Sequence, residues 1–156
     1  MKPVIALVGR PNVGKSTLFN RLVGRRRSIT LDTPGVTRDP ITADVEWDGR
    51  RVRIVDTGGL GGETEIALAD RVHEHTVRSV DDADLIVAVF DARAGVSPLD
   101  RETVDLLERT GLPILYVANK CEGPRQDEAA ADFCSLGIDT PITVSAEHGA
   151  GIGELR

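Results

Sequence analysis

Two glycines, a lysine and a serine occur at a spacing that suits the binding of phosphate groups. Gly9, Gly14, Lys15 and Ser16 match the pattern G-x-x-x-x-G-K-[ST], between the apolar run at 4–8 and a helical pattern that follows. The glycines let the backbone wrap closely around anionic oxygens, and the helix N-terminus adds its dipole. A turn that merely joins a strand to a helix would explain the glycines but not the lysine and serine. The segment therefore predicts a phosphate-binding loop.

The side chains near this loop suit a nucleotide with its magnesium ion. Lys15 is placed to bridge the outer phosphates, and the hydroxyl of Ser16 can ligate Mg²⁺. Asp56 ends a strand one hairpin later, where its carboxylate can hold a Mg²⁺-bound water and the glycines after it let a backbone N–H approach the terminal phosphate. A turn of this composition can serve only to connect two elements, but its position one hairpin after the phosphate loop favours a functional role. The expected contacts here are Gly9, Arg10, Pro11, Asn12, Val13, Gly14, Lys15, Ser16, Thr17, Asp56, Thr57, Gly58, Gly59 and Leu60.

Two later segments bear on the base of the nucleotide. The first follows the buried run at 114–118 and carries Glu122, and the second follows the last strand. A carboxylate there can accept both N1–H and N2–H of guanine, whereas adenine would leave it unpaired, so GTP is predicted over ATP. We expect Asn119 to brace the loop, Lys120 to lay its stem over the ring and the Ala146 N–H to reach guanine O6. The expected contacts are Asn119, Lys120, Cys121, Glu122, Ser145, Ala146 and Glu147.

Apolar runs that alternate with helical patterns predict the elements that must position these residues. The runs at 4–8, 85–90 and 114–118 are continuous, as in strands buried on both faces. Segments on either side of Asp48-Gly49 alternate between apolar and polar residues, which predicts a hairpin, and the run at 141–145 predicts a sixth strand. We therefore predict an α/β fold: a mostly parallel six-stranded sheet with one antiparallel edge strand and helices on both faces.

Helical patterns occupy the gaps between the strands. The first covers 18–23 and ends at Gly24; another begins at a capping Ser97 with Pro98 and Asp100; a third covers 129–136 and stops at Gly137. A weaker pattern covers 64–80. After the last strand, a glycine-rich turn leads into the start of one more helix.

Composition narrows the class of protein. The 156 residues suit a single domain, and the net charge of −6 argues against nucleic-acid binding by this segment alone. No apolar run approaches the roughly eighteen residues that span a bilayer. Cys121 and Cys134 match no disulfide or metal pattern, so we expect reduced thiols and a cytoplasmic protein without membrane contact. His73, His75 and His148 are expected at the surface, without metal-ligand neighbours.

Five segments together resemble one family of nucleotide-binding proteins. GRPNVGKS, PGVTRD, DTGG, NKxE and SAEHGxGIG, in this order across nearly the whole chain, resemble the P-loop GTPases of the Era and Der branch, and most closely the N-terminal G domain of the Der (EngA) family. The resemblance implies a G-domain fold in a protein with two tandem G domains and a C-terminal KH-like domain. We therefore expect residues 1–156 to be one G domain of a longer chain, cut within its last helix. Glu122 departs from the aspartate that most GTPases carry, which bears on base selectivity.

The resemblance also implies switch and catalytic residues. Thr37 would be the switch threonine that closes on Mg²⁺ and the γ-phosphate, completing a metal set with Ser16 and Asp56. Leu60 stands where Ras-like enzymes have a water-orienting glutamine. Asn12 implies a K⁺ ion that neutralises charge beside the phosphates, and Arg38 is a rival source of positive charge. The catalytic candidates are Asn12, Lys15, Thr37 and Gly59.

The sequence leaves alternative functions open. The resemblance implies a slow, K⁺-stimulated GTPase that acts as a switch in assembly of the large (50S) ribosomal subunit or its precursor. Because Leu60 has no hydrogen-bonding group, a second interpretation is a nucleotide-gated binding module that hardly hydrolyses GTP and docks on ribosomal RNA or a protein. An ATP-using kinase would share only the phosphate loop. Arg25, Arg26 and Arg27 suit a helix C-terminus or an RNA contact.

Overall fold

A single mixed sheet forms the centre of the computed structural model, which describes residues 2–10, 12–24, 28–30, 41–56 and 80–156. The strand order is β2-β3-β4-β1-β5-β6-β7. Strands β1 (Val4–Val8), β4 (Arg50–Asp56), β5 (Leu85–Asp91), β6 (Ile114–Asn119) and β7 (Ile142–Thr143) run parallel. Strand β3 (Ile41–Trp47) pairs antiparallel with β4 and with the short β2 (Ser28–Thr30). The predicted α/β class is confirmed. The sheet has a seventh strand, β2, which was not predicted and forms the edge. The antiparallel strand β3 is therefore the second strand of the sheet and not its edge.

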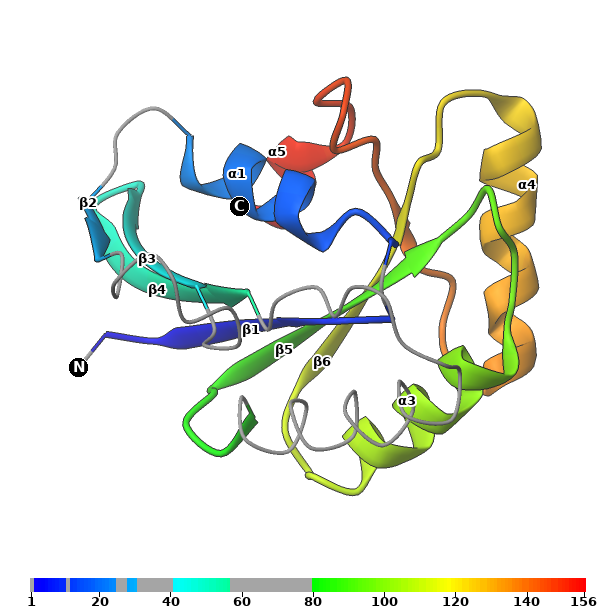
Figure 1. Cartoon of the computed structure of the whole chain (residues 1–156), viewed down its shortest axis with the longest axis horizontal. Helices are drawn as coiled ribbons and strands as arrows, with labels where there is room; N and C mark the ends of the chain where they lie inside the picture. The colour runs from blue at the N-terminus through cyan, green and yellow to red at the C-terminus, as the bar shows by residue number, and fades with distance from the viewer. Residues whose placement is uncertain (1, 11, 25–27, 31–40, 57–79) are drawn as a thin grey trace.

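Helices cover both faces of this sheet. Helix α1 (Lys15–Val23) and α5 (Ile152–Leu155) lie on one side, and α3 (Pro98–Glu108) lies on the other (Figure 1). Helix α4 (Pro124–Ala131) continues into a 3-10 turn, η1 (Asp132–Leu136). No helix among the described segments is long and apolar enough to cross a bilayer.

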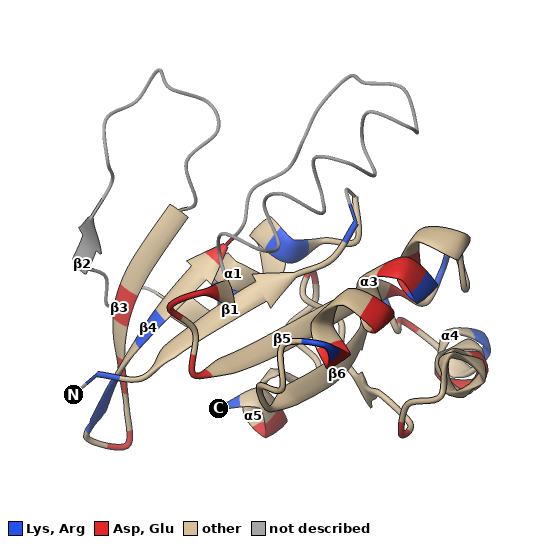
Figure 2. Cartoon of the chain, turned by 90° about the horizontal axis from the view of Figure 1, so that it is seen from below, with Lys and Arg blue, Asp and Glu red and all other residues tan. Residues whose placement is uncertain are grey.

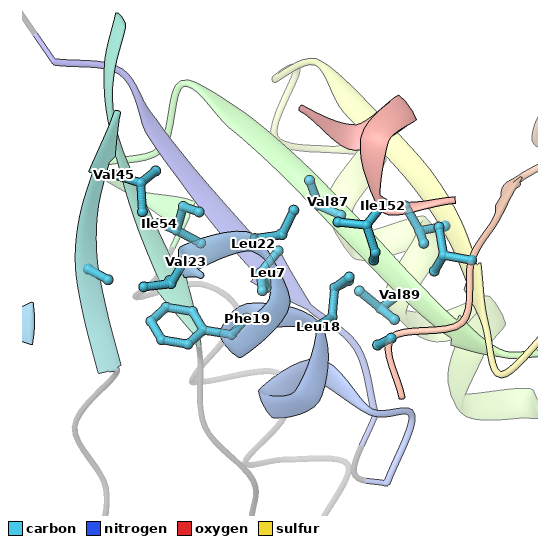
Figure 3. Packing of buried hydrophobic residues seen from close by; sticks show 14 of the residues in the cluster. Leu7, Leu18, Phe19, Leu22, Val23, Val45, Ile54, Val87, Val89 and Ile152 are labelled. Atoms are coloured by element: carbon cyan, nitrogen blue, oxygen red, sulfur yellow. The ribbon is translucent and has the colours of Figure 1, made fainter. Parts of the chain in front are cut away.

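The central strands bury alternate residues on opposite faces, which explains their continuous apolar sequence. Leu7, Val87 and Val89 belong to the cluster beneath α1 and α5, where they pack with side chains such as Leu18 and Ile152 (Figure 3). Their sequence neighbours face the other way and pack in the clusters under α3 and η1: Ala6, Val8, Ile86, Ala88 and Phe90. A strand covered on both sides has no polar face to offer solvent.

Local sequence signals account for most helix ends. Ser97 accepts the N–H of Asp100 and Asp100 accepts the N–H of Ser97, the predicted capping box, with Pro98 at the first helical position. Gly24 follows α1 with a φ of 64°, as predicted. Gly137 ends the third pattern as expected, although its final turn is the 3-10 helix η1 rather than α-helix. The predicted helix at 64–80 lies outside the described residues except for Val80.

The predicted hairpin joins β3 to β4. Asp48 and Gly49 have φ angles of 49° and 79°, the left-handed pair that a tight two-residue turn needs. Full pairing runs from Trp47 opposite Arg50 to Ile41 opposite Asp56. The hairpin therefore brings Asp56 back to the carboxyl end of β1, where the phosphate loop begins.

Candidate functional site

The predicted site segments converge on one edge of the sheet. Strands β1, β5 and β6 are parallel, so their carboxyl ends meet at the same edge, and Asp91 pairs directly with Asn119 at the ends of β5 and β6. Ligand sites of open α/β sheets form at this edge. Gly9 follows β1 at this edge. The segment after β7, which contains Ser145 and Ala146, lies at the same edge.

The phosphate loop requires glycine at two positions. A Cβ on Gly9 would lie 2.5 Å from the carbonyl oxygen of Val89. The first residue after β1 must therefore be glycine for the loop to pass this close to β5. Gly14 has a φ of 92°, and a Cβ there would lie 2.3 Å from Nδ2 of Asn119. Gly14 is also the N-cap of α1 and offers no side chain to the first backbone N–H groups of the helix. Those donors suit an anionic ligand.

Lys15, Ser16 and Asp56 come together beneath this loop. Lys15 is 7% exposed and Asp56 is 1% exposed, and the hydroxyl of Ser16 donates to Oδ2 of Asp56 at 3.2 Å. Burial lowers the pKa of Lys15, while the charge of Asp56 opposes that change. A hydroxyl and a carboxylate oxygen are hard donors of the kind that Mg²⁺ takes, so the residues present fit the predicted metal. Figure 2 shows basic colour at the start of α1, whereas α3 carries mainly acidic residues.

Asn119 joins the two halves of the predicted site. Its Nδ2 donates to the carbonyl oxygen of Val13 at 2.9 Å, and its Oδ1 accepts the backbone N–H of Ala146 at 2.9 Å. The side chain is buried, so both hydrogen bonds are shielded from water. The expectation that Asn119 braces the loop is confirmed. In this structure the Ala146 N–H donates to Asn119, and its expected contact with guanine O6 stays a prediction.

Lys120 links the base-side loop to the phosphate loop, and Asp91 holds it there. Its Nζ donates to the carbonyl oxygen of Asn12 at 2.6 Å and to Oδ2 of Asp91 at 2.8 Å. Burial alone would raise the pKa of Asp91, but the hydrogen bonds from Lys120 and from two backbone N–H groups lower it overall. Sequence reasoning missed Asp91. The available signal was a carboxylate at the end of a buried strand, at the edge where the other motifs gather.

Glu122 lies among charged side chains from two other loops. Its Oε2 accepts a hydrogen bond from Nη2 of Arg93 at 2.5 Å, and its Oε1 lies 3.6 Å from Nε2 of His148. Glu122, Glu147 and His148 have ligand atoms within 4.8 Å of one another, all on exposed residues. The prediction that His148 has no such neighbours is therefore wrong, because the turn after β7 folds it onto Glu122. Its exposure is as predicted.

Other predicted contact residues turn their side chains elsewhere. Nε of Arg10 donates to Oδ1 of Asp100 on α3 at 3.2 Å, so its side chain points toward that helix. The thiol of Cys121 packs against the carbonyl oxygen of Ala118, and burial raises its pKa to about 11. The hydroxyl of Ser145 accepts the N–H of His148 at 3.3 Å and so shapes its own turn.

Several predicted residues lie outside the described segments. They include most of both expected switches, one phosphate-loop residue, the arginines and two histidines: Pro11, Arg25, Arg26, Arg27, Thr37, Arg38, Thr57, Gly58, Gly59, Leu60, His73 and His75. Their assignments stay predictions.

A family model described as "50S ribosome-binding GTPase" matches residues 4–120, which include the phosphate loop, Asp56 and Asn119. The chain belongs to this family. The protein named GTPase Der from Geobacter sp. (strain M21) is 52% identical over 155 residues, which make up 99% of this chain and 35% of that protein. The chain thus spans about a third of the length of such curated relatives.

Two solved structures of Era share the fold of this GTPase-family chain. An Era variant from Aquifex aeolicus bound to GDP·AlF4⁻ is 28% identical with a TM-score of 0.74, covering 99% of this chain and 55% of that one. Era in complex with MgGDPNP and nucleotides 1506–1542 of 16S ribosomal RNA is 27% identical with the same TM-score and the same coverage. The predicted resemblance to the Era and Der branch is therefore confirmed.

Proposed function

We propose that this chain binds guanine nucleotide with Mg²⁺ and hydrolyses GTP to GDP and phosphate. The observation that carries the proposal is the buried side chain of Asn119, which hydrogen-bonds Val13 of the phosphate loop and Ala146 of the base-side loop. A buried amide with both hydrogen bonds made also stabilises the fold. The functional argument comes from which loops it joins, because they carry the predicted phosphate-binding and base-binding residues. A ligand that spans both loops, with phosphates at one end and a base at the other, needs their separation to be fixed before it binds.

Each end of the nucleotide has its own residues in this proposal. Backbone N–H groups of the phosphate loop and the start of α1 hold the phosphates, and the buried Lys15 supplies positive charge. Ser16 and Asp56 would hold Mg²⁺, which neutralises phosphate charge and orients the oxygens. At the far end, Glu122 accepts from guanine, and Lys120 lays its stem beside the ring.

Hydrolysis is expected to be slow and stimulated by K⁺. Leu60 follows the glycine turn and has no group to orient water, so another source of charge stabilisation is needed. Asn12 is exposed on the phosphate loop with a φ of 66°, and its carbonyl oxygen accepts from Lys120. We assign K⁺ binding to Asn12, and we assign closure on the γ-phosphate to Thr37 and Gly59.

The longer protein would use this cycle as a switch in assembly of the large ribosomal subunit, in the cytoplasm. The family description, which names binding to the 50S ribosomal subunit, supports contact with that subunit, and the name GTPase Der of the Geobacter relative supports the use of GTP. The acidic surface of α3 does not suit RNA phosphates, so ribosome contact is expected to come from other parts of the protein. The alternative is a nucleotide-gated module with little turnover, which Leu60 favours.

A multiple-turnover assay separates these two functions. Phosphate release from GTP is measured with Mg²⁺ in equal concentrations of KCl or NaCl, with ATP as the control substrate. The GTPase proposal predicts steady release that is faster in KCl and absent with ATP. Retention of GTP without release in either salt would favour the binding module, and equal rates in both salts would remove the role given to K⁺.

A further inference from the structure

Arg93 contacts the residue on which base selection depends. Its Nη2 donates to Oε2 of Glu122 at 2.5 Å, across 29 residues of sequence. The Arg93 side chain is 57% exposed and that of Glu122 is 22% exposed. Ion pairs this exposed contribute little to folding stability, because water screens them. The main effect of this contact is therefore on the position of the Glu122 carboxylate, not on the stability of the fold.

The fold places Arg93 against Glu122 by a short and well-defined route. Asp91 ends β5 in register with Asn119 at the end of β6, so the next residues of both strands start side by side. Oδ1 of Asp91 accepts the backbone N–H groups of Arg93 and Ala94 at 2.9 and 3.0 Å, which turns the chain immediately after the strand. The same carboxylate holds Lys120 through Oδ2. Both loops thus take their starting geometry from one buried side chain.

Glutamate at this position needs an anchor more than aspartate would. Its additional methylene adds a rotatable bond, and a freely rotating carboxylate loses entropy when a ligand fixes it. A charge-assisted hydrogen bond from a guanidinium restricts that rotation before the ligand arrives. A carboxylate has about four acceptor positions, so the bond from Arg93 leaves acceptors on both oxygens for N1–H and N2–H of guanine. His148, 3.6 Å from Oε1, is too distant to take one by hydrogen bonding.

We propose that Arg93 is a positioning residue for base selection, which orients the Glu122 carboxylate so that it accepts both guanine N–H groups. This inference rests on the proposed function, because it assumes that Glu122 faces the base. Arg93 itself need not touch the nucleotide.

The test compares GDP with inosine diphosphate, whose base lacks the 2-amino group of guanine. Calorimetric dissociation constants for both ligands are measured with Mg²⁺ on the unaltered chain and on Arg93→Gln, which keeps the backbone N–H that Asp91 accepts. The ratio of the two constants reports the second hydrogen bond to Glu122. In Arg93→Gln the ratio of the inosine diphosphate constant to the GDP constant is expected to fall about fivefold or more, mainly because GDP binds more weakly. A general loss of positive charge or of folding would weaken both ligands equally.

Two further variants locate the effect. Arg53→Gln is the matched control, because it breaks another exposed pair, Arg53 with Asp44, on strands β3 and β4; it should leave the preference unchanged. Glu122→Asp shortens the side chain and so withdraws the carboxylate from Arg93. In the double variant, Arg93→Gln should therefore change the preference for GDP less than about twofold relative to Glu122→Asp alone. An unchanged preference in Arg93→Gln, with GDP still bound, would overturn this inference and leave the proposed function standing. Failure of the unaltered chain to bind GDP would overturn the proposed function itself.

Discussion

Replacing Asn119 by alanine should separate the two loops of the site and weaken the fold at the same time. The substitution removes the partners of the Val13 carbonyl and the Ala146 N–H, both held at 2.9 Å by a side chain that is 2% exposed. A buried backbone group that loses its partner costs about 1–3 kcal/mol, so the pair predicts a loss of about 2–6 kcal/mol. That is a large share of the roughly 5–15 kcal/mol by which a domain is stable.

Urea unfolding with and without GDP measures both effects on the same protein. A ligand at 100 times its dissociation constant stabilises the native state by about 2.7 kcal/mol, and a tenfold weaker ligand at that concentration by about 1.4 kcal/mol. Asn119→Ala should therefore lower the free energy of unfolding and also at least halve the stabilisation that GDP provides. The second effect is the informative one, because it requires that Asn119 preorganise the loops for the ligand.

Thr103→Val provides the control for a lost buried hydrogen bond. The hydroxyl of Thr103 donates to the carbonyl oxygen of Leu99 at 2.8 Å within α3, and the side chain is buried. This variant should lose about 1 kcal/mol or less and keep the full stabilisation by GDP. The reasoning is refuted if the free energy of unfolding of Asn119→Ala lies within about 0.5 kcal/mol of that of the unaltered chain. It is also refuted if GDP stabilises Asn119→Ala as much as it stabilises the unaltered chain.

Three further predictions test other parts of the site. Gly14→Ala, which forces a Cβ to 2.3 Å from the Asn119 amide at a φ of 92°, should abolish binding of a fluorescent GDP analogue; retained binding would contradict the tight approach. Asp91→Asn should destabilise the chain at pH 7 and do so less at pH 3, because the pKa of Asp91 is lowered in the folded protein. The stability that this gives is complete above the ordinary value of 3.8 and is lost as the pH falls through the folded value; unfolding curves at both pH values check the sign. Iodoacetamide at pH 8 should label the exposed Cys134 well before Cys121, whose pKa of about 11 leaves roughly one thiolate in a thousand; equal labelling by mass spectrometry would contradict its burial.

Local patterns predicted most of the fold because each one has a single physical cause. The continuous run at 85–90 predicted a strand covered on both faces. The Asp48-Gly49 pair between alternating segments predicted the hairpin, and both residues have the left-handed φ that its turn needs. Strand β2 escaped prediction because three residues carry no periodicity. It nevertheless decides which strand forms the edge of the sheet.

The motifs predicted Lys15 and Asn119 as site residues, but they did not predict the residues that contact them and their neighbours across the loops. Asp91 and Arg93 act through partners 29 residues away, and those contacts depend on how β5 and β6 align. Register between strands is a property of the assembled sheet, so local spacing does not show it. The same holds for the hydrogen bond from the Ala146 N–H to Asn119, which joins residues 27 positions apart.

The central claim is that main-chain amides at the start of α1, together with the ammonium group of Lys15, hold the phosphates of a guanine nucleotide. Calorimetric titration of GDP with Mg²⁺ into the unaltered chain and into Lys15→Met tests it most directly. We expect one GDP per chain in the first titration and binding at least about 100-fold weaker in the second, with both proteins folded. No uptake of GDP by the unaltered chain, or equal affinity in both titrations, would contradict the claim.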